Sequence, residues 1–158
     1  MHTIPLERET DFDGWRKAAR VLVLNDVKPS DVTWTVRGNE PQLLEPTADQ
    51  ALQPPPGSFQ GSFNVSAKFL ELAQSAILHR DAKRFAILYR LVWRLRSHHD
   101  LLNASTDPDV ALATAMAKAV HRDQHRMQTS VRFREIGREQ NSHFVTWFEP
   151  EHHIVEAC

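Results

Sequence analysis

Apolar residues recur at helical spacing through the middle of the chain, and this periodicity most constrains what the chain can fold into. Residues 83–96 carry one apolar stripe, which predicts an amphipathic helix. The segment that starts at Ser66 shows the same spacing, and a further helix is predicted from Pro108, capped by Asp107, to about Met127. Because each helix has an apolar face to bury, we expect a helical bundle.

The first sixty residues add one helix, one strand and a Pro-rich loop. Residues 12–24 have helical spacing and can be capped by Asp11 or Asp13. Residues 31–36 alternate in polarity and favour β-type residues, which predicts a short strand. Residues 38–61 contain a run of three prolines, which neither a helix nor a central strand tolerates. A loop is predicted there, either as a mobile surface connection or as a functional flap.

The end of the chain predicts a β-hairpin followed by the start of a helix. Residues 129–136 and 142–148 are typical of two antiparallel strands around a turn at 137–141. Glu149 and Pro150 are typical of the first turn of a helix. We expect that helix to be truncated at the end of the chain, or to be completed by a partner.

Length and composition fit one globular domain. The 158 residues are 41% apolar and 25% charged, which is ordinary for a protein with its own core. We expect a single α+β domain over residues 1–158, a helical bundle packed on a small antiparallel sheet. Cys158 is the only cysteine, which excludes an internal disulfide and favours a cytoplasmic location. No apolar run approaches the roughly 20 residues of a membrane span, and the first residues lack the apolar core of a signal peptide.

Basic residues concentrate in the middle of the chain, although the formal net charge is only -1. Residues 80–138 hold 12 Lys and Arg against 6 Asp and Glu. Nucleic-acid phosphates are bound by such clusters, and aromatic rings can stack on unpaired bases. The alternative is a solvated basic face with the aromatic rings in the core. The predicted phosphate contacts are Arg90, Arg94, Arg122, Arg126, Arg132 and Arg134, and the predicted stacking residues are Trp147 and Phe148.

Two histidines have the spacing of metal ligands. His121 and His125 lie four residues apart on one predicted helix, so they share a face. Lys118 and Arg122 lie on the same face and would repel a cation. We therefore expect no metal and no other cofactor, although Glu149, His152 or His153 could supply a third ligand.

A catalytic alternative uses a carboxylate and imidazoles near the end of the chain. Glu149 with His152 or His153, together with His125, could share acid–base work in a nuclease- or glycosylase-like enzyme. The competing explanation for Glu149 is stabilisation of a helix N-terminus. The sequence has no Ser–His–Asp arrangement, no phosphate-binding glycine loop and no dinucleotide fingerprint.

Several segments together resemble a known bacterial family. They are TDFDGWRKAAR, FLELAQSAILHRDAKRFAILYRLVWRLR, DPDVALATAMAKAVHRDQHRM, and VRFRE with FVTWFEPEHHIVE. In these segments the chain is similar to a bacterial domain of unknown function that carries a DNA-metabolism label. That domain is the N-terminal part of fusions with a UdgX-type uracil-DNA glycosylase. It also occurs beside a radical-SAM protein of DNA modification or repair.

The resemblance implies DNA-repair partners but carries no catalytic residue over to this chain. The iron–sulfur cysteines and the uracil pocket of the glycosylase belong to its own domain, and nothing here matches them. We therefore expect an accessory domain that holds DNA, with single-stranded character favoured, for a fused or associated glycosylase or radical-SAM protein. The alternatives are an enzyme that acts on DNA and a domain that binds only other proteins.

Overall fold

The computed structural model describes residues 1–38, 64–131, 134–136, 143–145 and 147–155. The predicted Pro-rich loop at 38–61 lies outside these residues except for its first position, and so does the predicted hairpin turn. That first position is Gly38, whose φ of 91° lies in the left-handed region that glycine adopts without a steric penalty.

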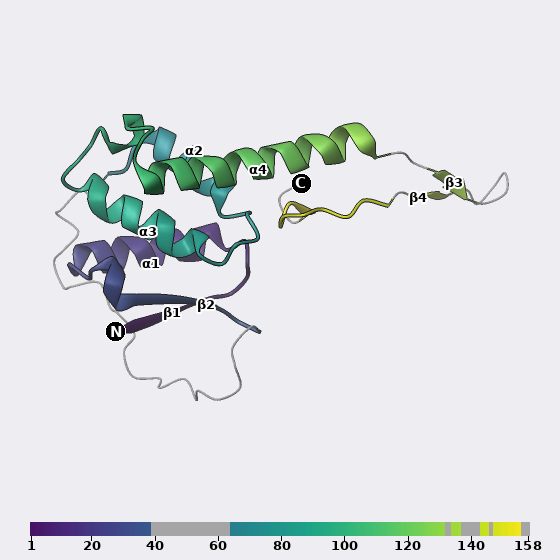
Figure 1. Cartoon of the computed structure of the whole chain (residues 1–158). Helices are drawn as coiled ribbons and strands as arrows, with labels where there is room; N and C mark the ends of the chain where they lie inside the picture. Colours follow the sequence, from purple (N-terminus) through teal and green to yellow (C-terminus); the bar gives the residue numbers. More distant parts are fainter. Residues whose placement is uncertain (39–63, 132–133, 137–142, 146, 156–158) are drawn as a thin grey trace.

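Four α-helices lie within the described residues, and they confirm the four that the periodicity predicts (Figure 1). Short polar side chains fix where three of them start. The carboxylate of Asp11 accepts the amide hydrogen of Gly14 at 2.9 Å, and the hydroxyl of Ser66 accepts that of Phe69 at 3.2 Å. Asp107 accepts two amide hydrogens in the first turn that it caps. These bonds satisfy donors that the start of a helix leaves without partners. The helices are α1 (Phe12–Leu24), α2 (Ala67–Ala76), α3 (Arg84–Leu95) and α4 (Pro108–Ser130).

The sheet that the helices cover is parallel, so the predicted packing of the bundle on an antiparallel sheet is wrong. β1 (His2–Leu6) pairs in parallel with β2 (Val32–Val36), with Leu6 opposite Val36. The chain between them includes α1, because parallel strands can be joined only by a crossover connection. The predicted strand at 31–36 is confirmed as β2, and the fold keeps a general α+β character.

The predicted hairpin strands form a separate two-stranded sheet. β3 (Arg134–Ile136) and β4 (His143–Val145) pair antiparallel over three residue pairs. Figure 1 shows this pair beyond the C-terminal end of α4, well away from β1 and β2. Since α4 continues to Ser130, the first strand starts later than predicted. A ribbon this short has too few residues to provide a core on which the bundle could pack.

The helix predicted from Pro150 is not formed in residues 150–154. These residues are irregular and bend at 151–153. The amide hydrogens of Glu151 and His152 are accepted by the Asp123 carboxylate of α4. That of His153 is accepted by the carbonyl group of Leu78, just after α2.

Aromatic side chains fill the space between α1, β2 and α3. Trp15, Trp34, Phe85 and Tyr89 form a chain of ring contacts around Trp34, with centroids 6.2, 6.5 and 5.8 Å apart. The indole N–H of Trp15 donates to the Phe85 carbonyl at 3.2 Å, and the hydroxyl of Tyr89 donates to the Val27 carbonyl at 2.7 Å. Burial raises the pKa of Tyr89, so its hydroxyl keeps the proton that it donates.

The packing of α2 on α4 uses small side chains instead. Ala73, Ala76, Ala113 and Ala117 are all buried, which lets the two helix axes approach closely. Among the described residues, no helix has both the length and the apolar content needed to cross a membrane.

Arg84 is a fully buried charged side chain that joins three parts of the chain. Its guanidinium donates to the carbonyl oxygens of Ile77 at 2.7 Å and Asp81 at 3.0 Å. It also donates to the Glu9 carbonyl at 2.7 Å and forms an ion pair with the Glu9 carboxylate. Burial lowers the pKa of Arg84, and the bond to Glu9 opposes that shift. Arg84 therefore fastens the residues before α1 to the corner between α2 and α3.

Replacing Arg84 with Ala should lower the free energy of unfolding by about 3 kcal/mol, because it leaves buried carbonyl groups without donors. Urea denaturation followed by circular dichroism would measure this loss. Glu9→Gln is the matched control, since it keeps the backbone carbonyl and removes only the charge of a partly exposed side chain, at a cost of about 1 kcal/mol or less. Equal losses in the two variants would show that the ion pair, rather than the carbonyl contacts, holds the corner.

Candidate nucleic-acid interface

The predicted phosphate-binding arginines fall into two groups along α4. Arg90 and Arg94 of α3 reach the first turn of α4, where aspartates bind them. Arg122 and Arg126 lie more than three turns later, which is roughly 20 Å along the helix axis. The structure therefore does not bring the predicted set together at one place.

The arginines of α3 anchor the start of α4. Arg90 Nη2 lies 2.7 Å from Asp109 Oδ1, while Arg94 forms an ion pair with Asp107 and lies 3.3 Å from Asp109 Oδ2. The bond from Arg94 is the main reason that the pKa of Asp107 falls to about 2, and backbone amides in the same turn add to it. A phosphate at these arginines would compete with carboxylates that already cap the helix.

The second half of α4 binds an irregular segment near the end of the chain, residues 147–155, which we call the C-terminal arm. Asp123 of α4 is only 5% exposed and connects the two. Its Oδ2 accepts the amide hydrogens of Glu151 at 2.9 Å and His152 at 3.0 Å. Its Oδ1 accepts from the guanidinium of Arg126 at 2.9 Å. One buried carboxylate thus fixes the middle of the arm to the helix.

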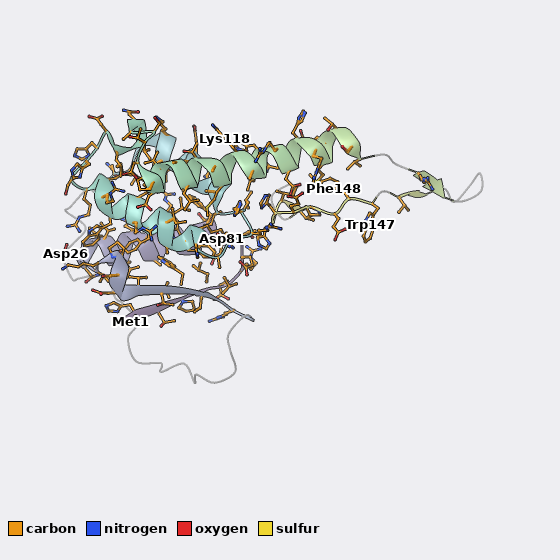
Figure 2. All side chains as sticks on the ribbon, viewed as in Figure 1. Met1, Asp26, Asp81, Lys118, Trp147 and Phe148 are labelled. Atoms are coloured by element: carbon orange, nitrogen blue, oxygen red, sulfur yellow. The ribbon has the colours of Figure 1, made fainter. Side chains whose placement is uncertain are left out.

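Two aromatic residues lead into this docked part of the arm. Trp147 is 87% exposed, whereas Phe148 is half-buried. The guanidinium carbon of Arg126 lies 5.8 Å from the centre of the Phe148 ring, within the range of a cation–π contact. Figure 2 shows both rings below α4 in the view, while Lys118 lies at its upper side.

A polar cavity of about 240 Å³ lies between α4 and the arm. It could hold several water molecules, at about 30 Å³ each, or a small polar group. Both arginines of the second half of α4 contribute to its wall. The lining residues are Ala119, Arg122, Asp123, Arg126, Glu151 and His152.

Two further predicted contacts come after α4. Arg134 is exposed in β3, beyond the end of the helix. Arg132 lies outside the described residues. Both therefore stay predictions as phosphate contacts.

The predicted acid–base residues are not bonded to one another. His125 and Glu149 are exposed, His153 is half-buried and His152 is buried. Within the described ranges the polar contacts of these side chains go elsewhere, such as from His153 Nε2 to the Glu9 carboxylate at 4.0 Å. The arrangement offers no hydrogen-bonded pair of a carboxylate and an imidazole for acid–base work.

The two histidines with ligand spacing on α4 also lack a third partner in the described part of the chain. His121 Nε2 lies 3.0 Å from the hydroxyl of Ser75 on α2. No group of three His, Cys, Asp or Glu side chains among the described residues is placed to hold a metal ion.

His152 packs against a second imidazole from the corner after α2. The ring centres of His152 and His79 are 4.4 Å apart. The Nδ1 of His152 accepts the amide hydrogen of Arg80 at 3.3 Å, and the Nδ1 of His79 accepts that of Asp81 at 3.1 Å. Burial is the main cause that lowers the pKa of both rings, and the charge of His152 lowers that of His79 further. Asp123 opposes the shift at His152 without reversing it.

The residues that dock the arm are not among the predicted site residues in that role, although the position of Asp123 in the sequence indicates it. Asp123 follows Val120 by three positions and Met116 by seven, which places a carboxylate on the buried stripe of α4. A buried carboxylate needs partners, so that position predicts a bonded structural role. Nothing local in the sequence pairs His79 with His152, because they meet only through the tertiary fold.

Acidification should weaken the folded state through the two stacked histidines. Since their folded pKa values lie below the ordinary value of about 6.5, the unfolded chain takes up protons first. Their contribution to stability is complete above about pH 6.5 and falls as the pH drops through the folded values. Urea denaturation at a series of pH values between about 8 and 5 would measure this slope.

His79→Asn should reduce that slope, because an Asn oxygen can still accept the Asp81 amide hydrogen while one titrating ring is removed. His99→Gln, in the exposed corner after α3, is the control and should leave the slope unchanged. The explanation fails when the slope of His79→Asn equals that of the unmodified protein.

Asp123→Ala should release the arm while the core stays folded. Hydrogen exchange at the amides of Glu151 and His152 should become faster by about tenfold or more, since each loses its acceptor. The amides of α3, such as that of Leu91, should keep their protection. Unchanged exchange at the two arm amides would contradict the anchoring role of Asp123.

Part of the chain is similar to a known family. No curated protein and no solved structure matches the chain. The model of a domain of unknown function, DUF4130, matches residues 82–158. This range starts just before α3 and includes α4 and the arm, whereas β1, α1, β2 and α2 precede it. A DUF4130 domain therefore occupies residues 82–158 of this chain.

Proposed function

We propose that this protein is an accessory nucleic-acid-binding domain that holds DNA with single-stranded character along the second half of α4 and the C-terminal arm. The observation that carries this proposal is Trp147, a large aromatic side chain that is 87% exposed beside a helix rich in cations. Solvation of so large a ring by water alone is unfavourable, so a partner surface is expected to cover it.

The charges near the arm support a phosphate-rich partner. Arg122 and Arg134 are exposed, and neither of them forms an ion pair with another described residue. Each cation that neutralises a phosphate releases a condensed counterion, which favours binding at low salt. The carboxylate of Asp123 detracts little from this field, because Arg126 and two backbone amides already compensate it.

The exposed ring supports a single strand rather than a duplex. An unpaired base can stack on Trp147, whereas a base inside a duplex is already stacked on its neighbours. Phe148 is half-buried against Arg126, so it is suited to hold the backbone of the arm in place beside a stacked base.

The biological setting follows from the resemblance of the segments. A domain with a DNA-metabolism label that accompanies a UdgX-type uracil-DNA glycosylase or a radical-SAM repair protein would present DNA to that enzyme. We therefore propose for this chain a role in bacterial cytoplasmic DNA repair, as a binding or scaffold module.

A protein partner is the second candidate occupant of the same surface. Val145 is 50% exposed and Val155 is 66% exposed, so apolar groups other than Trp147 also face outward near the arm. An apolar protein interface would persist at high salt, whereas phosphate contacts would weaken there. The salt dependence of binding thus separates the two candidates.

Trp147→Ala should weaken binding of a labelled single-stranded oligothymidine about tenfold, because the stacking platform is lost. Arg122→Ala and Arg134→Ala should each lower the slope of log affinity against log salt by about 0.7. Fluorescence anisotropy over a salt series would measure both effects, with a duplex of equal length for comparison.

Arg16→Ala with Arg20→Ala is the matched control, since these variants remove the same charge from an exposed face of α1. That pair should leave the salt slope unchanged. The proposal fails when no oligonucleotide binds at low salt, or when the α1 variants lose as much affinity as the variants near the arm.

A further inference from the structure

The cavity between α4 and the arm has the chemistry of an anion site. Two arginines, Arg122 and Arg126, contribute to its wall. Among the described residues, Arg122 has no carboxylate partner, so its charge is available to a bound group. Arginine is the side chain best suited to phosphate, because its fork of N–H donors matches the phosphate oxygens.

Arg126 binds two carboxylates of very different character. Its Nη2 lies 2.9 Å from Asp123 Oδ1, and its Nη1 lies 3.1 Å from Glu151 Oε1. The side chain of Asp123 is 4% exposed, whereas that of Glu151 is 58% exposed. Asp123 also holds two arm amides and cannot leave without undocking the arm. The side chain of Glu151 is held by Arg126 through an exposed ion pair, and such surface ion pairs contribute little to stability.

His152 also lines this cavity, and its ring carries one N–H donor when neutral. Because its Nδ1 accepts the Arg80 amide hydrogen, the proton of the neutral ring lies on Nε2. A neutral imidazole N–H can donate to a phosphate oxygen without adding charge to the cavity. Its position is fixed by Asp123 through the backbone and by His79 through the ring contact.

We propose that this cavity is a subsite for one phosphate group and that Glu151 is a built-in competitor for it. The proposal rests on the function proposed above, of which it names the phosphate site. In the structure the Glu151 carboxylate occupies one side of the Arg126 guanidinium. When Glu151 turns outward, the two arginines outweigh the single carboxylate of Asp123, and a phosphate can take the vacated donors. The phosphate can belong to a nucleic-acid strand or to a free phosphate compound, since both present the same oxygens.

The test compares Glu151→Gln with Glu149→Gln. Both replacements remove one negative charge from the same arm and keep the side-chain shape, and Glu149 is exposed and makes no ion pair with a described residue. Glu151→Gln should raise the affinity for phosphate several-fold, because an amide competes poorly for a guanidinium. Glu149→Gln should change it less than twofold. Arg122→Ala in the Glu151→Gln background should remove the gain.

Two probes separate the sources of the phosphate. Binding of inorganic pyrophosphate would be followed by isothermal titration calorimetry, and binding of labelled oligothymidine by fluorescence anisotropy, for each variant. Circular dichroism spectra would confirm that every variant is folded. For at least one probe, the affinity should be highest for Glu151→Gln, lower for the unmodified protein and lowest for Arg122→Ala.

The outcomes distinguish this proposal from the function on which it rests. When oligothymidine binds but the two glutamate variants behave alike, the phosphate subsite is wrong and the nucleic-acid function stands. When pyrophosphate shows the expected order but no oligonucleotide binds, the subsite stands for free phosphate compounds and the nucleic-acid function is wrong. When neither probe binds any variant, both are wrong.

Discussion

The contacts of the buried Arg84 guanidinium are the interaction on which the rest of the structure depends. A charge in the interior is tolerated only when its donors are satisfied, and here backbone carbonyls from two segments and one carboxylate do so. This fixes the corner between α2 and α3. The residue after Ile77 in that corner is Leu78, whose carbonyl accepts the amide hydrogen of His153. The position of the arm therefore depends on a guanidinium that donates no hydrogen bond to the described residues of the arm.

Some basic residues of the chain hold other elements in place, whereas others face solvent. Arg84, Arg90 and Arg94 bind carboxylates or carbonyls that connect helices, which accounts for part of the charge excess in the middle of the chain. Lys118 and Arg122, near the middle of α4, remain turned toward solvent. Charge composition alone cannot separate the two uses, because both place arginines on amphipathic helices. The difference lies in whether a carboxylate or carbonyl oxygen from another part of the chain lies opposite the arginine.

Local signals in the sequence predict the helices well, because caps and periodicity act within a few residues. The limits of α1 were predicted at both ends, and Asp107 with Pro108 marked the start of α4. The sheet could not be predicted in the same way. Pro5 argues against a strand at His2–Leu6, and only the fold shows that this strand lies at an edge, where proline is tolerated. A parallel pair also lacks the turn signal that a hairpin provides.

The candidate site shows the same division between local and distant information. The sequence indicates that Trp147 and the cations of α4 are residue types that can bind a nucleic acid. It does not indicate which of them lie close together in the fold. Arg90 and Arg94 belong to the same predicted set of phosphate contacts as Arg122 and Arg126, but the structure places them at the start of α4, away from the other two. The docking of the arm depends on contacts between positions far apart in the chain, such as Asp123 with Glu151, and periodicity contains no information on these.

The parallel pairing of β1 with β2 has a consequence for folding during synthesis. The two strands are separated by about thirty positions, and the ring of Trp34 in β2 packs on Phe85 and Tyr89 of α3, some fifty positions later. β1 can pair with β2 early, but β2 gains its ring contacts with α3 only after about fifty further positions have been synthesised. Such non-local pairing slows folding and leaves the early strand exposed to other chains. For a nascent chain, the synthesis of α3 is the point at which the N-terminal half can become stable.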